Sequence, residues 1–449
     1  MRSILFAAVL VAACHGNDPA TGGTGTASSA PATTPSAVAT PTPAQAATAE
    51  PAPAPTPKVT DNGETKVADS ANKPAPPPAP DAKVPPPGGH DFTAEAKAMY
   101  AVGACGEGGA PEGFPKDLLA KHCDVIDKAQ SDYTESWVKP ARAFFEAHVP
   151  KDIPKTVVYP FAGGDLSTAL TVYPDADEIT TLSLEPAGDP RDIDVLKGKD
   201  LERALDKVEY ELKFLYRVNF SNTMNMIEAM RAGSLPTELI FALSAMKIHG
   251  YEIVQLRYFK INDDGTLHYL DDADIAKAGD PLKVKPETRN FLFANAELEF
   301  KKPGGRIQVW RHIRANLGDE DSKGIGSGLK KDPRVLKHLE LKGEIAAMTK
   351  AASYLLSWDS FSLMRGFLLK HVVWMVSDAT GVAPKWGKPA GFEYETYGAF
   401  VGPHIPAGNS IQKDWRTEFE SQDKRELPFR FGYYDKKNQN HLIIMRRKK

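Results

Sequence analysis

The sequence predicts an α/β fold with a mostly parallel sheet and a closing antiparallel hairpin. The first observation is a strand–helix–strand unit in residues 156–186, and the second is the return of that rhythm in the last third of the chain. The third is that residues 16–90 are rich in proline, alanine and threonine and almost lack large apolar side chains. Because such a segment cannot bury enough surface to offset the entropy of ordering, we expect the folded part to begin near residue 91.

Residues 156–186 form the strand–helix–strand unit. Thr156–Tyr159 is β-branched and aromatic, which is typical of a buried strand, and a second strand is predicted at residues 179–184. A glycine turn and a helix over residues 166–172 separate the strands, with Asp165 at the capping position. In a parallel sheet four residues lie along the edge where open α/β folds bind ligands: Gly163, Gly164, Asp165 and Glu185.

The rest of the folded part divides into helices and short strands. Residues 91–155 predict a helical N-terminal subdomain, and residues 156–449 predict the α/β domain. Helices are predicted at residues 92–101, 118–126, 133–149, 201–215, 222–231, 236–248, 360–370 and 415–420. Further strands are predicted at residues 251–256, 351–356 and 372–376.

Two hairpins are predicted. Lys301–Gly305 joins two strand-like stretches in an insertion near residues 291–317, which either rims a pocket or leans on the sheet. The closing hairpin pairs residues 429–434 with residues 441–445 around a polar turn. The glycines of residues 324–328 lack the preceding strand and the Gly-Lys-Ser/Thr ending of a phosphate loop, so they predict an ordinary loop.

Residues 1–13 have the three parts of a secretory signal peptide: an early positive charge, a short apolar run and a small-residue end. The segment Leu10–Cys14 resembles the lipobox of bacterial lipoproteins. That resemblance implies cleavage before Cys14, acylation of Cys14 (palmitate and related chains) and a membrane anchor, since several acyl chains anchor a protein stably. His15 after the cysteine favours the outer membrane, facing the periplasm or the cell surface. The alternative is an ordinary secretory leader whose cysteine is accidental.

Three cysteines are present, an odd number for an exported chain. If Cys14 is lipidated, Cys105 and Cys123 remain, and an oxidising compartment favours a disulfide between them over two free thiols. Neither lies in a Cys-x-x-Cys motif or near a histidine cluster, so the sequence predicts no metal site.

Residues 14–90 predict a disordered tether. Its proline runs favour extended polyproline II structure, which would hold the folded part away from the bilayer. The whole chain has 55 basic and 58 acidic side chains and a net charge of −3. That balance argues against nucleic acid as a partner, because nucleic-acid binders normally show a basic excess.

The order of elements is similar to that of class I methyltransferase-like Rossmann domains, over residues 150–449 and with large insertions. In that family the first turn contacts S-adenosylmethionine and an acid after the second strand binds the ribose. The resemblance places Gly163, Gly164 and Asp165 at the first position and Glu185 at the second. This turn departs from the family because it is bulkier and Pro160 removes a backbone donor. An exported domain would also lack the cofactor, so we expect the fold without methyl transfer and no cofactor.

Four short motifs also resemble a set of uncharacterised bacterial envelope proteins. They are Tyr159–Asp165, Leu184–Pro186, Ala352–Leu355 and Val376–Gly381. This second resemblance supports the fold and implies no chemistry.

Three carboxylates, Asp165, Glu185 and Asp378, are expected to converge at the carboxyl edge of the sheet, with Trp358 and Asp359 lining the same crevice. Paired carboxylates can perform acid–base catalysis or hold a cation, although they can also cap a helix or accept loop amides. The motifs of the common exported hydrolases are absent from the sequence.

Two functions therefore stay open. The first is a tethered binding or structural module with a protein or small-molecule ligand, and the second is an envelope transferase or hydrolase. An open acidic cluster would favour the enzyme, whereas a crevice filled by Tyr159, Phe161 or the N-terminal helices would favour the module. The sequence favours the module and assigns no catalytic residue.

Overall fold

A computed structural model describes residues 88–108, 112–219, 235–321, 329–403, 409–433 and 439–448. The predicted signal peptide, Cys14 and all but the last three residues of the predicted tether lie outside these ranges. So do the helix predicted at residues 222–231 and the glycine loop at residues 324–328.

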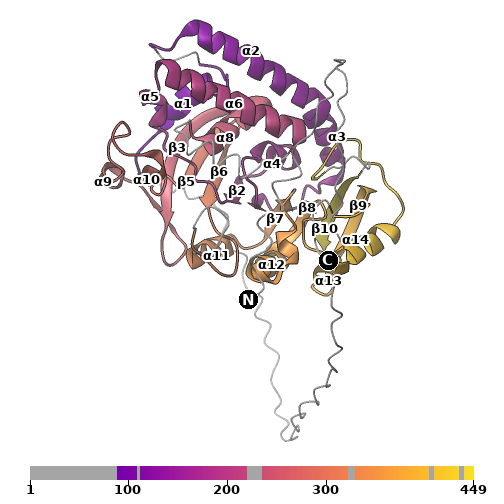
Figure 1. The fold of residues 1–449 in the computed structure, drawn as a ribbon. Helices are drawn as coiled ribbons and strands as arrows, with labels where there is room; N and C mark the ends of the chain where they lie inside the picture. The colour runs from indigo at the N-terminus through magenta and orange to yellow at the C-terminus, as the bar shows by residue number, and fades with distance from the viewer. Residues whose placement is uncertain are drawn as a thin grey trace, which may run out of the picture. The chain divides into compact units, whose positions relative to one another are not determined.

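The described residues form a mixed α/β structure around one ten-stranded sheet (Figure 1). The strands are β1 Thr156–Pro160, β2 Glu178–Ser183, β3 Glu252–Ile261, β4 Leu267–Tyr269, β5 Asn295–Lys301, β6 Ile307–Arg314, β7 Ile345–Thr349, β8 Val372–Ser377, β9 Phe392–Ala399 and β10 Asn440–Arg447. Their order across the sheet is β4-β3-β5-β6-β2-β1-β7-β8-β10-β9.

The five central strands, β6-β2-β1-β7-β8, run parallel to one another. Antiparallel strands extend the sheet on both sides, with β5, β3 and β4 beyond β6, and β10 and β9 beyond β8. The prediction of a mostly parallel sheet is wrong, since five of the nine strand pairs described are antiparallel. The reason is that the predicted insertion is not a separate arm: β6 hydrogen-bonds to β2 and carries β5 and β3 into the main sheet.

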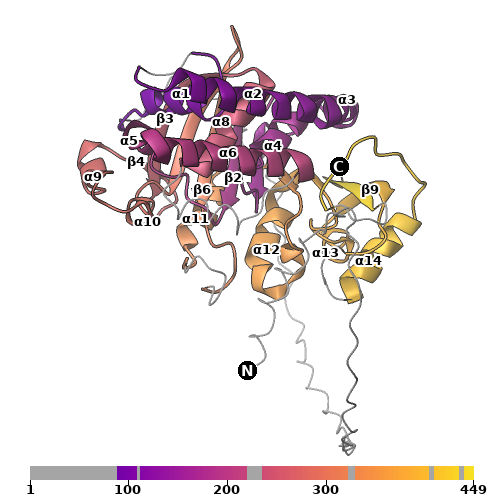
Figure 2. The ribbon, with the colours of Figure 1, turned by 45° about the horizontal axis from the view of Figure 1, so that its top comes forward.

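Helices cover both faces of the sheet (Figures 1 and 2). One face packs against α1 Thr93–Val102, α2 Lys116–Tyr133, η1 Thr134–Val138, α3 Lys139–His148, α4 Leu166–Val172, α5 Asp192–Val195, α6 Gly198–Val218 and α8 Thr237–His249. The opposite face of the sheet packs against α11 Pro333–Glu340, α12 Ser362–His371, α13 Pro384–Gly387 and α14 Asn409–Glu420. The short helices α9 Asp272–Ala276 and α10 Pro286–Arg289 lie along the chain between β4 and β5.

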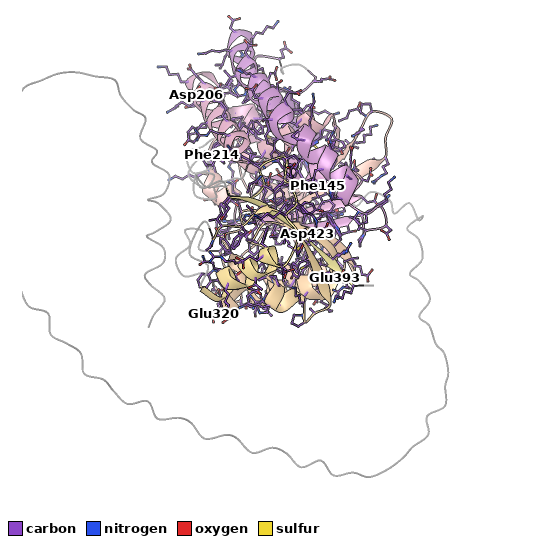
Figure 3. All side chains as sticks on the ribbon, turned by 90° about the vertical axis from the view of Figure 1, so that its right-hand side faces the viewer. Phe145, Asp206, Phe214, Glu320, Glu393 and Asp423 are labelled. Carbon is purple, nitrogen blue, oxygen red and sulfur yellow. A yellow bond between two sulfur atoms is a disulfide. The ribbon has the colours of Figure 1, made fainter. Side chains whose placement is uncertain are left out.

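Helix α8 is apolar on nearly every side because it is enclosed. It contacts α1, α4, α6 and β3, and eleven of its residues are buried. The amphipathic α6 packs on α2 as well as on α8. The burial contrast is visible in side chains: Phe145 of α3 is 1% exposed, whereas Asp206, Glu320 and Glu393 lie at the surface (Figure 3).

Several predicted elements are confirmed. The unit at residues 156–186 forms β1, α4 and β2, and the stripe at residues 201–215 forms α6. Cys105, just after α1, and Cys123, within α2, form the predicted disulfide. The helix predicted at 118–126 is longer, since α2 spans Lys116–Tyr133, and the helix predicted at 133–149 forms η1 and α3, which continue directly from α2.

Two strand predictions are wrong. Residues 351–356 are not a strand, because Ala351, Ser353 and Tyr354 have left-handed φ angles of 52°, 49° and 57°. The strand is instead β7, a run of small and medium side chains whose β propensity is modest but whose five residues are all buried. The closing hairpin is also formed differently, since β10 pairs with β9 and β8 rather than with the described residues 429–433, and residue 434 lies outside the described ranges.

Candidate functional site

The loops after β1 and β7 lie next to each other at the carboxyl edge of the sheet, since these strands are parallel neighbours. Four non-glycine residues in these loops have left-handed φ angles: Phe161, Ala351, Ser353 and Tyr354. Only two other described non-glycine residues do, Cys105 and Asn219. Such backbone strain persists only where the surroundings hold it, and it concentrates at ligand sites and other specialised positions.

A buried ion pair joins the two loops. Lys350, directly after β7, places Nζ 2.6 Å from Asp165 Oδ2, and the two side chains are 0% and 2% exposed. Lys350 also donates to Thr168 Oγ1 at 2.6 Å, and Thr168 donates to Asp165 Oδ1 at 2.7 Å. Tyr159 donates its hydroxyl to Asp165 Oδ2 at 2.9 Å. Asp165 stands at the predicted N-cap position of α4, but its side chain accepts none of the helix amides.

The pKa values of this cluster follow from burial. Burial lowers the pKa of Lys350, and Asp165 opposes that shift. Burial raises the pKa of Tyr159 well above its usual value, and the Asp165 carboxylate raises it further. The cluster therefore depends on its internal hydrogen bonds, because water cannot solvate the charges.

Aromatic side chains cover the ion pair. Lys350 Nζ lies 5.4 Å from the centre of the Trp137 ring and 5.9 Å from that of Phe431. Trp137 belongs to η1 of the N-terminal helices, and its indole donates to Arg430 O at 2.5 Å. The protein's own side chains thus fill the space beside Asp165.

The two glycines of the predicted turn have different structural roles. Gly163 has a φ of 52°, which the tight turn after β1 requires. Gly164 lets α8 approach, because a Cβ atom there would overlap the ring of Phe241. The close contact at Gly164 is therefore with the protein itself.

Asp378, after β8, is buried and serves as an acceptor for loop amides. Its Oδ2 accepts from the backbone N–H of Ala351 at 3.1 Å and of Tyr433 at 3.3 Å, and its Oδ1 accepts from Thr380 N at 3.0 Å. The Asp378 carboxylate therefore holds the loop after β7 in place through hydrogen bonds to backbone amides. This geometry fits the structural interpretation of the carboxylate better than an acid–base role.

Trp358 and Asp359 lie at the surface. Trp358 is 39% exposed, and the Asp359 side chain is fully exposed with Arg365 Nη2 3.9 Å away. Since Asp165, Glu185 and Asp378 are buried, the structure does not bring these two residues into the same buried cluster.

Glu185 lies in a second buried cluster on the α8 side of the sheet. His312 of β6 places Nε2 2.8 Å from Glu185 O and Nδ1 3.3 Å from Oε1 of Glu238, in the first turn of α8. Glu185 is 0% exposed, and neither of its carboxylate oxygens has a hydrogen-bond partner in the described part of the chain. Arg314, the last residue of β6, donates a hydrogen bond from Nε to Leu184 O at 3.0 Å.

The charges of this second cluster are coupled. Burial raises the pKa of Glu238 despite His312, and the neighbouring Glu185 and Asp165 raise it further. Burial would lower the pKa of His312, but Glu238 outweighs it and raises the pKa. Both shifts favour the protonated forms of these two side chains.

Sequence reasoning missed Lys350, Glu238, His312 and Arg314. Each gave a weak signal, namely a charged or polar residue inside or just after an apolar run. Such residues are common at surfaces too, so only the folded arrangement shows that these four are near Asp165 and Glu185.

No grouping of three or more histidine, cysteine, aspartate or glutamate side chains suited to a metal ion occurs among the described residues. In those same ranges, no helix has the length and apolar character needed to cross a bilayer. Comparison of the chain with protein-family models, curated proteins and solved structures gives no match. The features of the described residues that bear on function are therefore the two buried clusters around Asp165 and Glu185.

Proposed function

We propose that the chain is a bacterial envelope lipoprotein, anchored through lipid on Cys14, whose folded part is a binding module rather than an enzyme. The leader and Leu10–Cys14 support the anchor, and the proline-rich stretch before residue 91 supports a spacer between membrane and module. The disulfide between Cys105 and Cys123 is consistent with an oxidising compartment.

The proposal includes a Rossmann-like origin for the scaffold. In chain order the parallel strands are β1, β2, β6, β7 and β8, so their order across the sheet is third, second, first, fourth, fifth. That is the order of doubly wound dinucleotide-binding folds, in which ligands bind where the order reverses, between the first and fourth strands. Here that point lies between β1 and β7, and the resemblance to class I methyltransferases would put S-adenosylmethionine there.

One structural observation favours a binding module over a cofactor-dependent enzyme. The point between β1 and β7 holds the Asp165–Lys350 ion pair, covered by Trp137 and Phe431. Placing a cofactor there would require moving a buried, hydrogen-bonded charge pair and two aromatic rings, which is costly. We therefore infer that the ancestral cofactor position is closed and that ligands bind elsewhere.

Ligand-induced thermal shift on the purified full-length chain tests this inference. The panel holds S-adenosylmethionine, its demethylated product, nucleotides and sugars. We expect no shift with S-adenosylmethionine, whereas a true ligand at 100 times its dissociation constant would add about 2.7 kcal/mol of stability. A shift with S-adenosylmethionine that Glu185→Ala abolishes would overturn the proposal.

The anchor is tested separately. Mass spectrometry of the N-terminal peptide from membranes should show acylated Cys14 as the first residue. The Cys14→Ser variant should leave the membrane fraction, and its retention there would contradict the lipid anchor.

The second candidate function, an envelope enzyme, is favoured by the unpartnered Glu185 carboxylate. Buried polar groups without a partner are rare and often have a catalytic or ligand-binding role. Turnover of an envelope substrate that is lost in Glu185→Gln, with the fold intact, would select this alternative.

A further inference from the structure

The cluster around Glu185 contains several hydrogen-bond acceptors without donors. Four buried side-chain oxygens there have no partner among the described residues: Ser183 Oγ, Glu185 Oε1, Glu185 Oε2 and Glu238 Oε2. Ser183 is 6% exposed, Glu185 is 0% exposed and Glu238 is 1% exposed. Ser183 and Glu185 are two residues apart at the end of β2, and Glu238 lies opposite in the first turn of α8.

These residues face the same side of the sheet. Side chains alternate along a strand, so Ser183 shares a face with Thr181, whose hydroxyl accepts from the Trp310 indole at 2.9 Å. Thr181 pairs with His312 across β2 and β6, and His312 lies 3.3 Å from Glu238. His312 also connects Glu238 with Glu185, because its other ring nitrogen, Nε2, lies 2.8 Å from Glu185 O.

The nearby cations are bonded elsewhere. His312 uses its two ring nitrogens on Glu238 and on the carbonyl of Glu185, and Lys350 binds Asp165. Arg314 donates Nε to Leu184 O, and its guanidinium lies 5.5 Å from the centre of the exposed Phe291 ring. Burial acts to lower the pKa values of His312 and Arg314 and the Glu185 carboxylate opposes that effect, but neither side chain donates a hydrogen bond to the Glu185 carboxylate oxygens. A buried carboxylate whose oxygens have no donor is unfavourable, so a charged donor supplied from outside would stabilise it.

We propose that Ser183, Glu185 and Glu238 form a binding site for a small primary amine in its ammonium form. This proposal rests on the binding-module function and names the ligand class of that module. An ammonium group has three donors and no acceptor, which matches the carboxylate oxygens of Glu185, while the Ser183 hydroxyl can accept as well as donate. A neutral polyol would satisfy hydrogen bonds but leave the carboxylate charge uncompensated.

The substituent of the amine would lie towards Arg314 and Phe291. Phe291 is 72% exposed, and Arg314 bonds the residue that precedes Glu185. A short alkyl or amino-alkyl chain is therefore the expected substituent.

The test uses the full-length chain with methylamine, ethylamine and putrescine as probes, and with ethanol and ribose as neutral counterparts. Thermal shift and calorimetry at pH 7 measure binding. We expect the amines to raise Tm and the neutral compounds to have no effect. No binding by any amine, or stronger binding of ribose than of the amines, would overturn the proposal.

The decisive variant is Glu185→Gln, which keeps the shape of the side chain and removes its charge. It should weaken amine binding at least tenfold, yet the unliganded variant should melt no lower than the wild type because an unpaired buried charge is gone. A lower Tm of unliganded Glu185→Gln would show that the chain itself compensates the carboxylate, and the inference would fail.

Glu178→Gln is the matched control, because Glu178 lies at the other end of β2 and is paired with Arg311 and Lys342. It should lower Tm and leave amine binding unchanged; equal loss of binding in both variants would contradict a local site.

The assay with S-adenosylmethionine separates the amine-site proposal from the binding-module proposal. Failure of amine binding alone removes this inference, whereas S-adenosylmethionine binding removes the module function itself.

Discussion

Lys350 Nζ and Asp165 Oδ2 lie 2.6 Å apart at the carboxyl edge of the sheet, although the two residues are far apart in the chain. The pair connects the loops after β1 and β7, where the strained residues Phe161 and Ala351 also lie. The ion pair thus occupies the position at which open α/β sheets generally bind a ligand.

Removing one member of this pair should be strongly destabilising. Lys350→Met leaves Asp165 buried without its cation, so we expect the free energy of unfolding to fall by about 3–5 kcal/mol. The double variant Lys350→Met with Asp165→Asn should lose much less than the sum of the single variants. Urea denaturation followed by circular dichroism measures both.

The control for that prediction is Lys128→Met. Lys128 pairs with Asp132 on the exposed face of α2, where the side chains are 77% and 68% exposed. Because solvent screens such a pair, its loss should change stability by less than about 1 kcal/mol. Equal effects of the two lysine substitutions would show that the buried pair has no special role.

The disulfide between Cys105 and Cys123 should contribute to stability through the loop it closes. The two residues are 18 positions apart, and on the chain-entropy estimate such a loop is worth about 3 kcal/mol. We expect a reductant to lower the urea midpoint of the wild type to that of the Cys105→Ala, Cys123→Ala double variant. A double variant as stable as the oxidised wild type would contradict the estimate.

Gly164→Ala should destabilise the protein because its methyl group would overlap the Phe241 ring. Overpacking of this kind typically costs about 1–3 kcal/mol. Adding Phe241→Leu should recover part of the loss, since the smaller side chain leaves room. Chemical denaturation of the three variants gives the comparison.

Gly366→Ala provides the matched control on α12, where a Cβ atom would meet nothing within 4 Å. Alanine in an exposed helical position should stabilise by roughly 0.4–1 kcal/mol. If both glycine variants shift stability in the same direction, the close contact between α8 and the turn is not the cause.

His249 should make stability depend on pH. Burial and Arg142 lower its pKa to about 3, and its Nδ1 accepts from Arg142 Nη2 at 2.6 Å. A depressed pKa contributes stability that is fully present above the unfolded value of 6.5 and is lost as pH falls towards about 3. The loss should reach about 1.4 kcal/mol per pH unit.

The measurement is the difference in unfolding free energy between the wild type and His249→Gln from pH 7.5 to pH 4. Other groups titrate equally in both proteins, so the difference isolates His249. We expect the stability advantage of the wild type to shrink as pH falls. A difference that stays constant across the range would show that His249 titrates normally in the fold.

Local sequence signals were sufficient where one element followed another closely. The β1–α4–β2 unit was predictable because its β-branched strands and the two glycines of the turn lie within about thirty residues. Helix α6 was predictable from a single apolar stripe. β7 was missed because Ala346 and Ala347 carry little β propensity, and its burial comes from the strands on either side.

The site was only partly predictable for the same reason. The sequence placed Asp165, Glu185 and Asp378 at strand ends, and the structure finds them there. The side chains near these carboxylates come from distant parts of the chain. Strand pairing brings in Lys350 and His312, and the packing of α8 against the sheet brings in Glu238. No local pattern encodes such contacts between distant residues.

By itself, the sequence determined the cysteine pair and the α/β character of the folded part, and it predicts a leader and a proline-rich tether, because composition and periodicity are local properties. The tertiary structure decided the strand order, the antiparallel extensions and the partners of each buried charge. It also decided that Asp165 is neutralised from within while the Glu185 carboxylate has no partner in the described chain. The physical reason is that the cost of burying a charge depends on which distant groups the fold brings beside it.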